Sequence, residues 1–367
     1  MRAILGFFKK EPILVISAAA AAVSCVLVPP DAAYLGYVDL RTLALLYALM
    51  LVVAGLRGAG AFTHLAHLVC ARAKTARGMG MLLVLMSFFS SMLITNDVAL
   101  MTFVPFAIVL LGMTGRQKDL IFVVVLQTVA ANLGSMLTPV GNPQNLYLYS
   151  HYALSAADFF RITVPAWGAS LLLTLLLCFA LPGAALHVDL GEKPGVEHRM
   201  LWLYLALFAV CLLSVLRVLP WPVMLGIVVA ALLIFDRKML LRADFMLLLT
   251  FVAFFIFAGN LARLPSVDRL LRRLLQGREY LTALLTSQII SNVPAALLLS
   301  GFSDNARDLL LGVDIGGLGT PIASLASLIS LKLYSRSENA HTGRYLLVFT
   351  LVNLALLLIL SAARSML

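Results

Sequence analysis

Long apolar runs dominate this chain, and polar residues gather in the short segments between them. Nine of the runs approach the roughly 20 residues that a helix needs to cross a bilayer core of about 30 Å. They cover residues 11–28, 40–57, 119–150, 161–182, 200–218, 221–235, 244–262, 306–335 and 341–363. A β-barrel would instead show alternating segments of about ten residues. The pattern therefore predicts an all-α polytopic membrane protein.

Two further apolar regions, 61–111 and 266–303, are interrupted by Asn96 and Asn292. Each region predicts two half-length helices joined by a polar turn, which is a re-entrant hairpin. Backbone at such a turn is tolerated inside a membrane only where protein or a water-filled cavity surrounds it. The two turns therefore indicate a buried polar site.

The two halves of the chain repeat the same polar order. The hairpin motif reads Ser91-Met-Leu-Ile-Thr95-Asn96 in the first half and Ser287-Gln-Ile-Ile-Ser291-Asn292 in the second. A Thr-Pro step in a glycine-bearing apolar segment follows each motif, first Thr138-Pro139 and then Thr320-Pro321. Alignment on Thr-Pro pairs Asn132 with Asp314, Gly134 with Gly316, and Asn142 with Ser324. Alignment on the hairpin asparagine pairs Asp97 with Val293.

This order predicts an inverted-repeat transporter fold, in which two unwound transmembrane helices accompany the two hairpins. Residues 1–182 form the first repeat, with about four spans and the hairpin at 61–111. Residues 183–220 supply a linker loop and a connecting helix, and residues 221–367 form the second repeat, with the hairpin at 266–303. Each repeat crosses the membrane an even number of times, so the single connecting helix turns the second repeat over. The first hairpin then enters from the cytoplasm and the second from outside.

Composition and charge refine this topology. The chain is 62% hydrophobic and 12% charged, whereas soluble domains are about a quarter charged. The net charge of +10 comes from Lys and Arg in short loops. These residues are expected to set the membrane topology and to contact anionic lipid headgroups rather than to bind nucleic acid. Their distribution predicts a bacterial-type inner membrane protein with the N-terminus in the cytoplasm and the C-terminus outside. The cytoplasmic segments are those with Arg2, Lys9 and Lys10, with Arg57, Arg72, Lys74 and Arg77, with Arg116 and Lys118, with Arg237, Lys238 and Arg242, and with Lys332, Arg336 and Arg344.

One arginine-rich segment conflicts with that assignment, because residues 263–278 would lie outside. Its leucines follow an amphipathic pattern, so a helix lying in the membrane interface explains it better than a reversed topology.

Enzyme motifs are absent from the sequence. It contains no GxSxG, HExxH, P-loop or dinucleotide fingerprint, which predicts that the chain is not an enzyme and binds no cofactor other than Na⁺. The four cysteines, Cys25, Cys70, Cys178 and Cys211, have no CxxC spacing and read as packing residues. His64 and His67 are either a metal-binding pair or one polar face of a helix.

The Thr-Pro steps predict helices that unwind in mid-membrane, because proline lacks a backbone donor and glycine weakens the helix. Unwinding frees carbonyl oxygens, which suit Na⁺, and creates a new helix N-terminus, which suits an anion. The candidate substrate-binding residues are Thr95, Asn96, Ser291, Asn292, Pro139, Gly141, Asn142, Thr320 and Ser324. The candidate Na⁺-binding or coupling residues are Ser91, Asn96, Asp97, Asn132, Gly134, Thr138, Ser287, Asn292, Asp314 and Gly316. For any single candidate residue, the alternative is a role in helix packing. The repetition of the same residue types in both halves favours a binding site.

Asp97 and Asp314 are the carboxylates predicted nearest to mid-membrane. A carboxylate at that depth is costly unless it pairs with a cation, a proton or donors. Both residues are therefore candidates for ion coupling. The alternatives are that Asp97 caps a hairpin helix and that Asp314 lies near the interface. No Lys or Arg is predicted at the same depth, so an anionic substrate would be bound by dipoles, hydroxyls and bound cations.

These segments resemble the ion transporter superfamily, which includes divalent anion:sodium symporters, citrate transporters, arsenite permeases and a group of Na⁺/H⁺ antiporters. The segment Thr138-Pro-Val-Gly-Asn-Pro-Gln-Asn145 is similar to the unwound region of the symporters, and the two hairpin motifs are similar to their Ser-Asn-Thr tips. The resemblance implies that these positions hold Na⁺ and a substrate carboxylate, that the protein is a homodimer, and that a hairpin-bearing domain moves like an elevator. Asp97 and Val293 replace the third motif residue of the symporters, and Asn96-Asp97 and Gly312-Val-Asp314-Ile-Gly316 look more like the arsenite permease and antiporter branch.

The leading hypothesis is a secondary active transporter that moves a small anion, either a di- or tricarboxylate or an inorganic oxyanion, coupled to Na⁺ or H⁺. A Na⁺/H⁺ antiporter or arsenite-type extrusion permease that uses Asp97 and Asp314 is the first alternative. A non-transporting membrane scaffold is the second, and it predicts dry, close-packed surroundings for Asn96 and Asn292. A channel is a weaker third.

Overall fold

The computed structural model describes residues 12–70, 73–185 and 195–363. The basic segment 1–10, Arg72 and residues 186–194 of the linker loop lie outside this range, so the predictions that fall on them are not addressed. The described chain is helical, and its one β-bridge joins Thr75 to Ala185.

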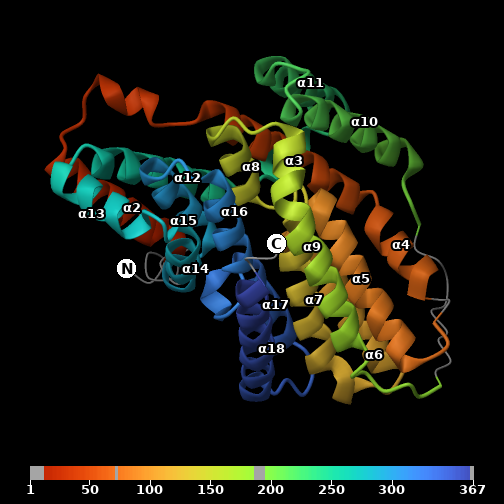
Figure 1. The fold of residues 1–367 in the computed structure, drawn as a ribbon. Coiled ribbons are helices and arrows are strands. Elements are labelled where there is room, and N and C mark those ends of the chain that lie inside the picture. The colour runs from red at the N-terminus through yellow and green to blue at the C-terminus, as the bar shows by residue number, and fades with distance from the viewer. Residues whose placement is uncertain (1–11, 71–72, 186–194, 364–367) are drawn as a thin grey trace, which may run out of the picture.

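Seventeen α-helices and five short 3-10 helices make up the described chain (Figure 1). The α-helices are α2 (Pro12–Leu27), α3 (Leu40–Gly58), α4 (Ala61–Cys70), α5 (Ala76–Ile94), α6 (Asn96–Met113), α7 (Leu120–Ser135), α8 (Pro143–His151), α9 (Ala156–Cys178), α10 (His198–Val215), α11 (Trp221–Phe235), α12 (Phe245–Ala262), α13 (Pro265–Leu275), α14 (Glu279–Ile290), α15 (Asn292–Leu299), α16 (Ala306–Ile315), α17 (Leu325–Ser335) and α18 (Thr342–Ala362). The 3-10 helices are η1 (Ala32–Gly36), η2 (Gln117–Asp119), η3 (Arg237–Leu241), η4 (Ser300–Phe302) and η5 (Pro321–Ala323).

Eight helical segments of the described chain are long and apolar enough to cross a membrane. This confirms the all-α polytopic class. Two of the nine predicted spans are shorter than a typical crossing, since α2 has 16 residues and α11 has 15. Two others are broken as predicted: α7 ends at Ser135 and α8 begins at Pro143, while α16 ends at Ile315 and α17 begins at Leu325.

The prediction of two half-length helices in region 61–111 was wrong. The region holds three helices, and α5 and α6 have 19 and 18 residues, so each is long enough to cross a bilayer by itself. The apolar sequence on either side of the tip simply continues, and even Pro105 lies inside α6 without ending it. In the second region α14 and α15 have only 12 and 8 residues, as expected, and the arginine-rich stretch forms the separate helix α13.

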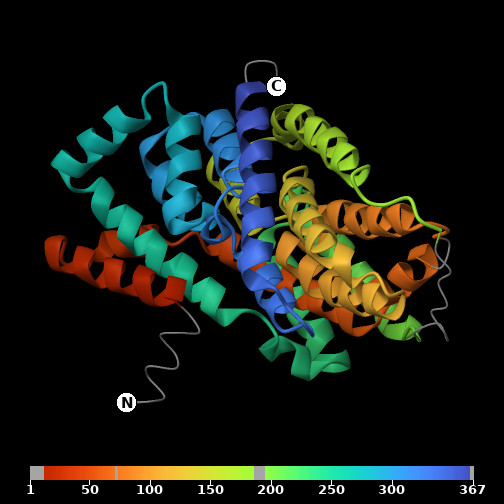
Figure 2. The same cartoon turned by 90° about the horizontal axis from the view of Figure 1, so that it is seen from below.

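Both regions nevertheless fold back at their asparagine. The amide Nε2 of Gln127 on α7 lies 3.4 Å from the carbonyl oxygen of Leu83 on α5 and 3.2 Å from that of Phe103 on α6. All three helices therefore run side by side (Figure 1). In Figure 2, α18 (dark blue) runs between α16 on one side and α7 and α9 on the other.

Some loops that the charge pattern assigns to the same side contact each other, and the side of the membrane on which each loop lies stays a prediction. At one end, Arg77 donates to the carbonyl of Leu181 (2.9 Å), and the amide of Glu197 donates to that of Ala59 (3.2 Å). At the other, Arg217 donates to the carbonyl of Ala153 (3.0 Å).

Arg263 belongs to the arginine-rich segment that conflicts with the charge-based topology. It pairs with the acidic 30–40 loop. Arg263 lies 2.8 Å from Asp31, and this hydrogen bond lowers the pKa of the Asp31 carboxyl. The pairing places residue 263 beside the 30–40 loop, where the predicted topology had put both segments.

Candidate functional site

The two hairpin tips share one unusual backbone conformation. Thr95 has φ 66° and ψ 150°, and Ser291 has φ 74° and ψ 154°. Residues with side chains rarely adopt this region, which costs on the order of 1–3 kcal/mol. In both halves a helix begins at the next residue, Asn96 or Asn292. The strained residue thus redirects the chain so that a helix N-terminus starts inside the protein.

The same contacts hold each tip against the broken helix of its own half. The hydroxyl of Thr138 donates to the carbonyl of Met92, and that of Thr320 donates to the carbonyl of Gln288 (3.3 Å). Met92 and Gln288 each lie four residues before the tip asparagine.

Glycines at equivalent positions complete this duplicated packing. A Cβ on Gly134 would lie 2.1 Å from the carbonyl oxygen of Phe88 and 2.8 Å from the hydroxyl of Ser91. A Cβ on Gly316 would lie 3.0 Å from both the Cα of Leu284 and the hydroxyl of Ser287. The sequence repeat is therefore also a repeat of local structure.

Four helix N-termini meet around one small cavity of about 30 Å³. They are those of α6 and α15, which follow the two tips, and of α8 and α17, which follow the two breaks. The residues that line it include Asn96, Asp97, Pro143, Gln144, Asn292, Val293, Ser324 and Leu325. The cavity is large enough for one or two water molecules. The predicted convergence of the two tips and two breaks is thus observed.

A hydrogen-bond network crosses between the halves beside this cavity. The Asn132 carbonyl oxygen Oδ1 accepts from the amide of Asn96 and the hydroxyl of Ser324, both at 3.0 Å. The Asp314 carboxylate accepts from the amides of Asn142 (3.4 Å) and Gln144 (3.3 Å). Asn132 is equivalent to Asp314, and Ser324 to Asn142, so the two contacts are the same contact made reciprocally.

Asp314 is the most deeply enclosed carboxylate of this network, with 2% of its surface exposed. Its oxygen Oδ2 is buried and has no hydrogen-bond partner within the described residues. A buried, unpartnered carboxylate oxygen suits a proton or a cation.

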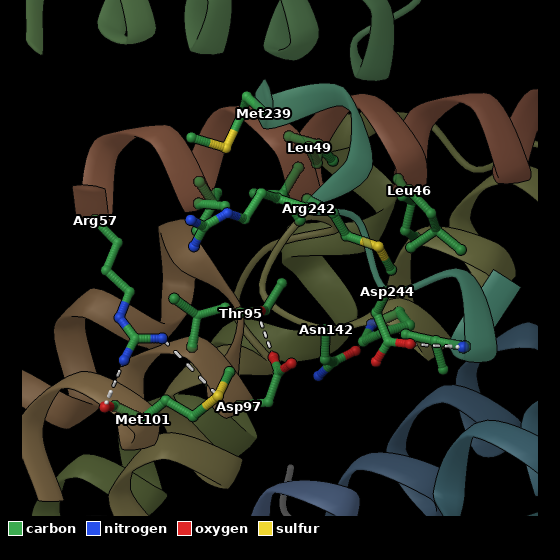
Figure 3. A pocket seen from close by; sticks show the side chains of 18 of the residues that line it. Leu46, Leu49, Arg57, Thr95, Asp97, Met101, Asn142, Met239, Arg242 and Asp244 are labelled. Carbon is green, nitrogen blue, oxygen red and sulfur yellow. Dashed lines mark hydrogen bonds between the residues drawn. The ribbon is translucent and has the colours of Figure 1, made fainter. Parts of the chain in front are cut away.

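A larger cavity of about 620 Å³ lies beside the small one, and Figure 3 shows side chains that line it. Asp97, Pro143 and Leu247 line both cavities, so the small cavity forms the inner end of the large one. Thr95 donates to the carboxylate of Asp97 at this inner end.

Arg57 and Arg242 line the large cavity as well. Both start at helix ends near the surface, and their long side chains reach inward (Figure 3).

A third cavity of about 470 Å³ lies at the opposite end of α3. Asp39 and Arg41 line it, whereas Arg57 lines the large cavity. The two spaces approach each other at α8, where Leu146 faces the large cavity and Tyr147 faces the third. The Tyr147 hydroxyl lies 2.8 Å from that of Ser300, which joins α8 to η4.

Backbone carbonyls at both breaks already have protein partners. The amide of Asn145 lies 3.3–3.5 Å from the carbonyls of Ser135, Met136 and Thr138. The amide of Gln288 donates to the carbonyls of Gly316 (2.7 Å) and Leu318 (3.0 Å). The expected free Na⁺ ligands are thus partly occupied, since each carbonyl keeps only its second lone pair.

The sequence analysis did not predict three amide side chains of the site. Gln144 and Asn145 lie in the segment Thr138–Asn145, and Gln288 lies in the second hairpin motif. Amide residues within these segments were the signal that could have identified them.

Several predicted residues hold the frame instead of lining a cavity. The hydroxyls of Ser91 and Ser287 donate to carbonyls of their own helices, at 2.8 and 2.7 Å. Gly141 accepts the backbone N–H of Asn96 (3.1 Å), and Ser291 donates to Ala323 (3.3 Å). Pro139 lies within the first break. Whether any of them binds substrate or cation stays a prediction.

No cluster of three or more His, Cys, Asp or Glu side chains that could hold a metal occurs in the described residues. The four cysteines are unpaired, and Cys70, Cys178 and Cys211 are buried, as expected of packing residues.

Comparison with known proteins gives one family match. Residues 4–307 match the family model described as citrate transporter. The inner membrane protein YbiR of Escherichia coli is 35% identical over 302 residues, which cover 81% of this chain and 80% of that protein. An uncharacterized transporter of Methanocaldococcus jannaschii is 31% identical over 328 residues, 89% of each chain. A silicon efflux transporter of rice (Oryza sativa subsp. japonica) is 33% identical over 143 residues, 38% of this chain and 29% of that protein.

Proposed function

We propose that this chain, which belongs to the citrate transporter family, is a secondary active transporter of a small anion. The substrate is a di- or tricarboxylate or an inorganic oxyanion, and its transport is coupled to Na⁺ or H⁺. The family match, the transporter names among its relatives and the apolar helices make it a multi-pass integral membrane transporter. The substrate, the coupling ion and the mechanism are the proposal.

The observation that carries the proposal is the convergence of four helix N-termini on one small cavity. Each N-terminus presents unpaired N–H groups and the equivalent of roughly half a positive charge. In low-dielectric surroundings such dipole ends favour an anion without a fixed lysine or arginine. The side chains of Asn96 and Asn292 line the same cavity, and the Asn96 amide keeps one N–H after its bond to Asn132.

Coupling follows from the carboxylate at this site. Asp97 lies at the N-terminus of α6 and lines both cavities. An ionised Asp97 repels a bound anion, because two negative charges in one enclosed site cost free energy. A proton or Na⁺ on Asp97 removes that repulsion, so cation and anion bind together. Asp314, with its unpartnered oxygen, offers a second position of the same kind.

Alternating access would use the two cavities at opposite ends of α3. In the described conformation the large cavity reaches the first tip, at Thr95, while the Tyr147–Ser300 contact joins α8 to η4 beside the third cavity. The arginine-rich loops around the large cavity suggest that this end faces the cytoplasm. Elevator-like movement of the hairpins against α3 and its neighbours, in a homodimer, would then expose the site to the third cavity.

Uptake into proteoliposomes under imposed gradients tests the proposal. Purified protein is reconstituted, and accumulation of radiolabelled citrate, succinate and sulfate is followed under an inward Na⁺ gradient, an inward H⁺ gradient, or neither. We expect at least one anion to accumulate only when a gradient is present. Equal flux under all three conditions would contradict coupled transport.

A Na⁺/H⁺ antiporter or a metalloid extrusion permease is the second candidate. The buried Asp314 and the partial match to the silicon efflux transporter favour it. Asp97→Asn separates the two: an antiporter loses all transport, whereas an anion symporter still binds its anion. The scaffold alternative predicts dry, close-packed surroundings for Asn96 and Asn292; the cavity of about 30 Å³ that both residues line favours the transporter.

A further inference from the structure

We infer that the loop between α6 and α7 and the loop between α17 and α18 together bind one phospholipid with an anionic phosphate headgroup. A cavity of about 240 Å³ lies between these two loops, both of which the charge pattern assigns to the cytoplasmic side. It shares no lining residue with the cavities at the hairpin tips. The site is therefore separate from the proposed transport site and does not depend on the proposed function.

Positive charge exceeds negative charge in this cavity. Lys118 lines it from the first loop and Arg344 from the second, while Glu338 is the carboxylate among its lining residues. None of these three takes part in an ion pair within the described residues. Asp119, next to Lys118 in the sequence, is held by Arg116 at 2.8 Å. The two cations thus leave an excess of positive charge, which favours an anionic ligand.

The N-terminus of a membrane-spanning helix adds backbone donors to this charge. His341 lines the cavity and precedes α18, but its side chain makes no capping hydrogen bond. The N–H of Tyr345 is the first of α18 to bond into the helix, to the carbonyl of His341 (2.9 Å). The N–H groups before Tyr345 are the orphan donors of a helix N-terminus, and such donors bind phosphate oxygens well. The cavity also offers polar side chains to a headgroup, namely Gln117, Ser337 and Asn339.

An exposed apolar stripe of α18 begins one turn beyond Arg344, and it identifies the ligand as a lipid. The stripe consists of leucines at a spacing of three or four residues, which places them on one face of the helix. They are Leu347, Leu351, Leu354 and Leu358, with exposed fractions of 61%, 60%, 45% and 58%. Arg344 belongs to the same spacing, so the cationic cavity and the apolar stripe are continuous. A phosphate at the cavity and an acyl chain along the stripe match this order, whereas a soluble phosphate compound leaves the stripe unused.

The bland alternative is that Lys118 and Arg344 only set membrane topology, as loop cations do. Arg336 provides the matched control, because it is exposed and lies in the same loop as Glu338 but does not line the cavity. A topological role makes Arg336 and Arg344 equivalent, whereas a binding site does not. Glu338→Gln provides a test in the opposite direction, since it removes the negative charge that an anionic headgroup meets in the cavity.

Thermal stability of the intact purified protein in detergent micelles tests the inference, because a ligand that binds the folded state raises the unfolding temperature. Dioleoylphosphatidylglycerol, dioleoylphosphatidylcholine, glycerol 3-phosphate and inorganic phosphate are each titrated into the wild type, K118Q, R344Q, E338Q and R336Q. We expect saturable stabilisation of the wild type by phosphatidylglycerol and little by the other three probes. K118Q and R344Q should each weaken the apparent affinity about tenfold, because a charged hydrogen bond is lost. E338Q should bind several-fold more tightly, and R336Q should match the wild type.

Three outcomes would overturn the inference. In the first, phosphatidylcholine stabilises the wild type as much as phosphatidylglycerol does. In the second, glycerol 3-phosphate or inorganic phosphate is as effective as phosphatidylglycerol, which makes the site one for soluble phosphates. In the third, folded K118Q and R344Q bind phosphatidylglycerol as the wild type does, or R336Q weakens binding as much as they do. If K118Q and R344Q do not fold, E338Q decides, and an affinity equal to that of the wild type would contradict the site. None of these results depends on whether the protein transports an anion.

Discussion

The two halves of the molecule share a frame but differ in where they carry charge. Each half has a strained tip, a threonine that holds the tip and a glycine against which the tip packs. In the first half the carboxylate is at the tip, Asp97, and the broken helix carries the neutral Asn132. In the second half the tip carries Val293 and the broken helix carries Asp314. Geometry is thus duplicated, whereas each charged position occurs once.

This difference separates the features that the fold requires, which are duplicated, from those that binding and coupling require, which are not. Tight glycines and hydroxyl contacts recur because both hairpins must dock on their broken helices in the same way. Carboxylates do not recur, because two at one tip level would place like charges around a single small cavity. Even the amides that satisfy the broken carbonyls come from different places, Asn145 on α8 and Gln288 on α14.

The largest effect is expected from removing the close approach that both halves share. A Cβ at Gly134 would lie 2.1 Å from a backbone oxygen, so Gly134→Ala forces the hairpin away from α7 and costs about 3 kcal/mol or more. Gly316→Ala should destabilise in the same direction. Gly168→Ala on α9, where nothing lies within 4 Å, is the control and should change stability by less than about 1 kcal/mol. Unfolding temperatures in detergent would measure this, and equal stability of all three variants would contradict the duplicated packing.

The next largest effect is expected at the tip carboxylate, which is Asp97 in the first half and is replaced by Val293 in the second. Asp97→Asn removes the carboxylate and should abolish accumulation driven by ion gradients while anion binding remains. Val293→Asp puts a second carboxylate at the cavity and should weaken anion binding by roughly a hundredfold, because an unpaired charge is added beside the anion. Uptake and equilibrium binding measure the two effects.

The double variant D97N/V293D sharpens this comparison, since it moves the carboxylate from one tip to the other. If the tips are functionally equivalent, it recovers ion dependence that D97N alone lacks. Failure to recover, with normal folding, would show that the tips are equivalent in shape only.

The smallest effect is expected at the paired serines. The hydroxyls of Ser91 and Ser287 donate to their own helices, so each alanine variant should lose about 1 kcal/mol or less. The half-maximal Na⁺ or H⁺ concentration for transport should stay near that of the wild type. A tenfold rise in either variant would instead identify the hydroxyls as cation ligands, as the sequence pattern predicts.

Much of this arrangement could be predicted from the sequence because the polar interruptions are local signals. Thr138-Pro139 and Thr320-Pro321 mark both helix breaks, and the split at Asn96 and Asn292 marks both tips. Helix length in the first hairpin could not be predicted, because apolar sequence continues past the tip without a stop signal. Arg57 and Arg242 were missed because their contribution depends on how α3 and η3 pack around the cavity, which no local pattern records.

The most direct test of the central claim is equilibrium binding of the transported anion to purified wild type, Asn96→Ala and Asn292→Ala. If one anion sits between both tips, each substitution alone should raise the dissociation constant by about tenfold, although the two residues lie nearly 200 positions apart in the sequence. Folded variants in which only one substitution weakens binding, or neither does, would contradict a single site built from both halves.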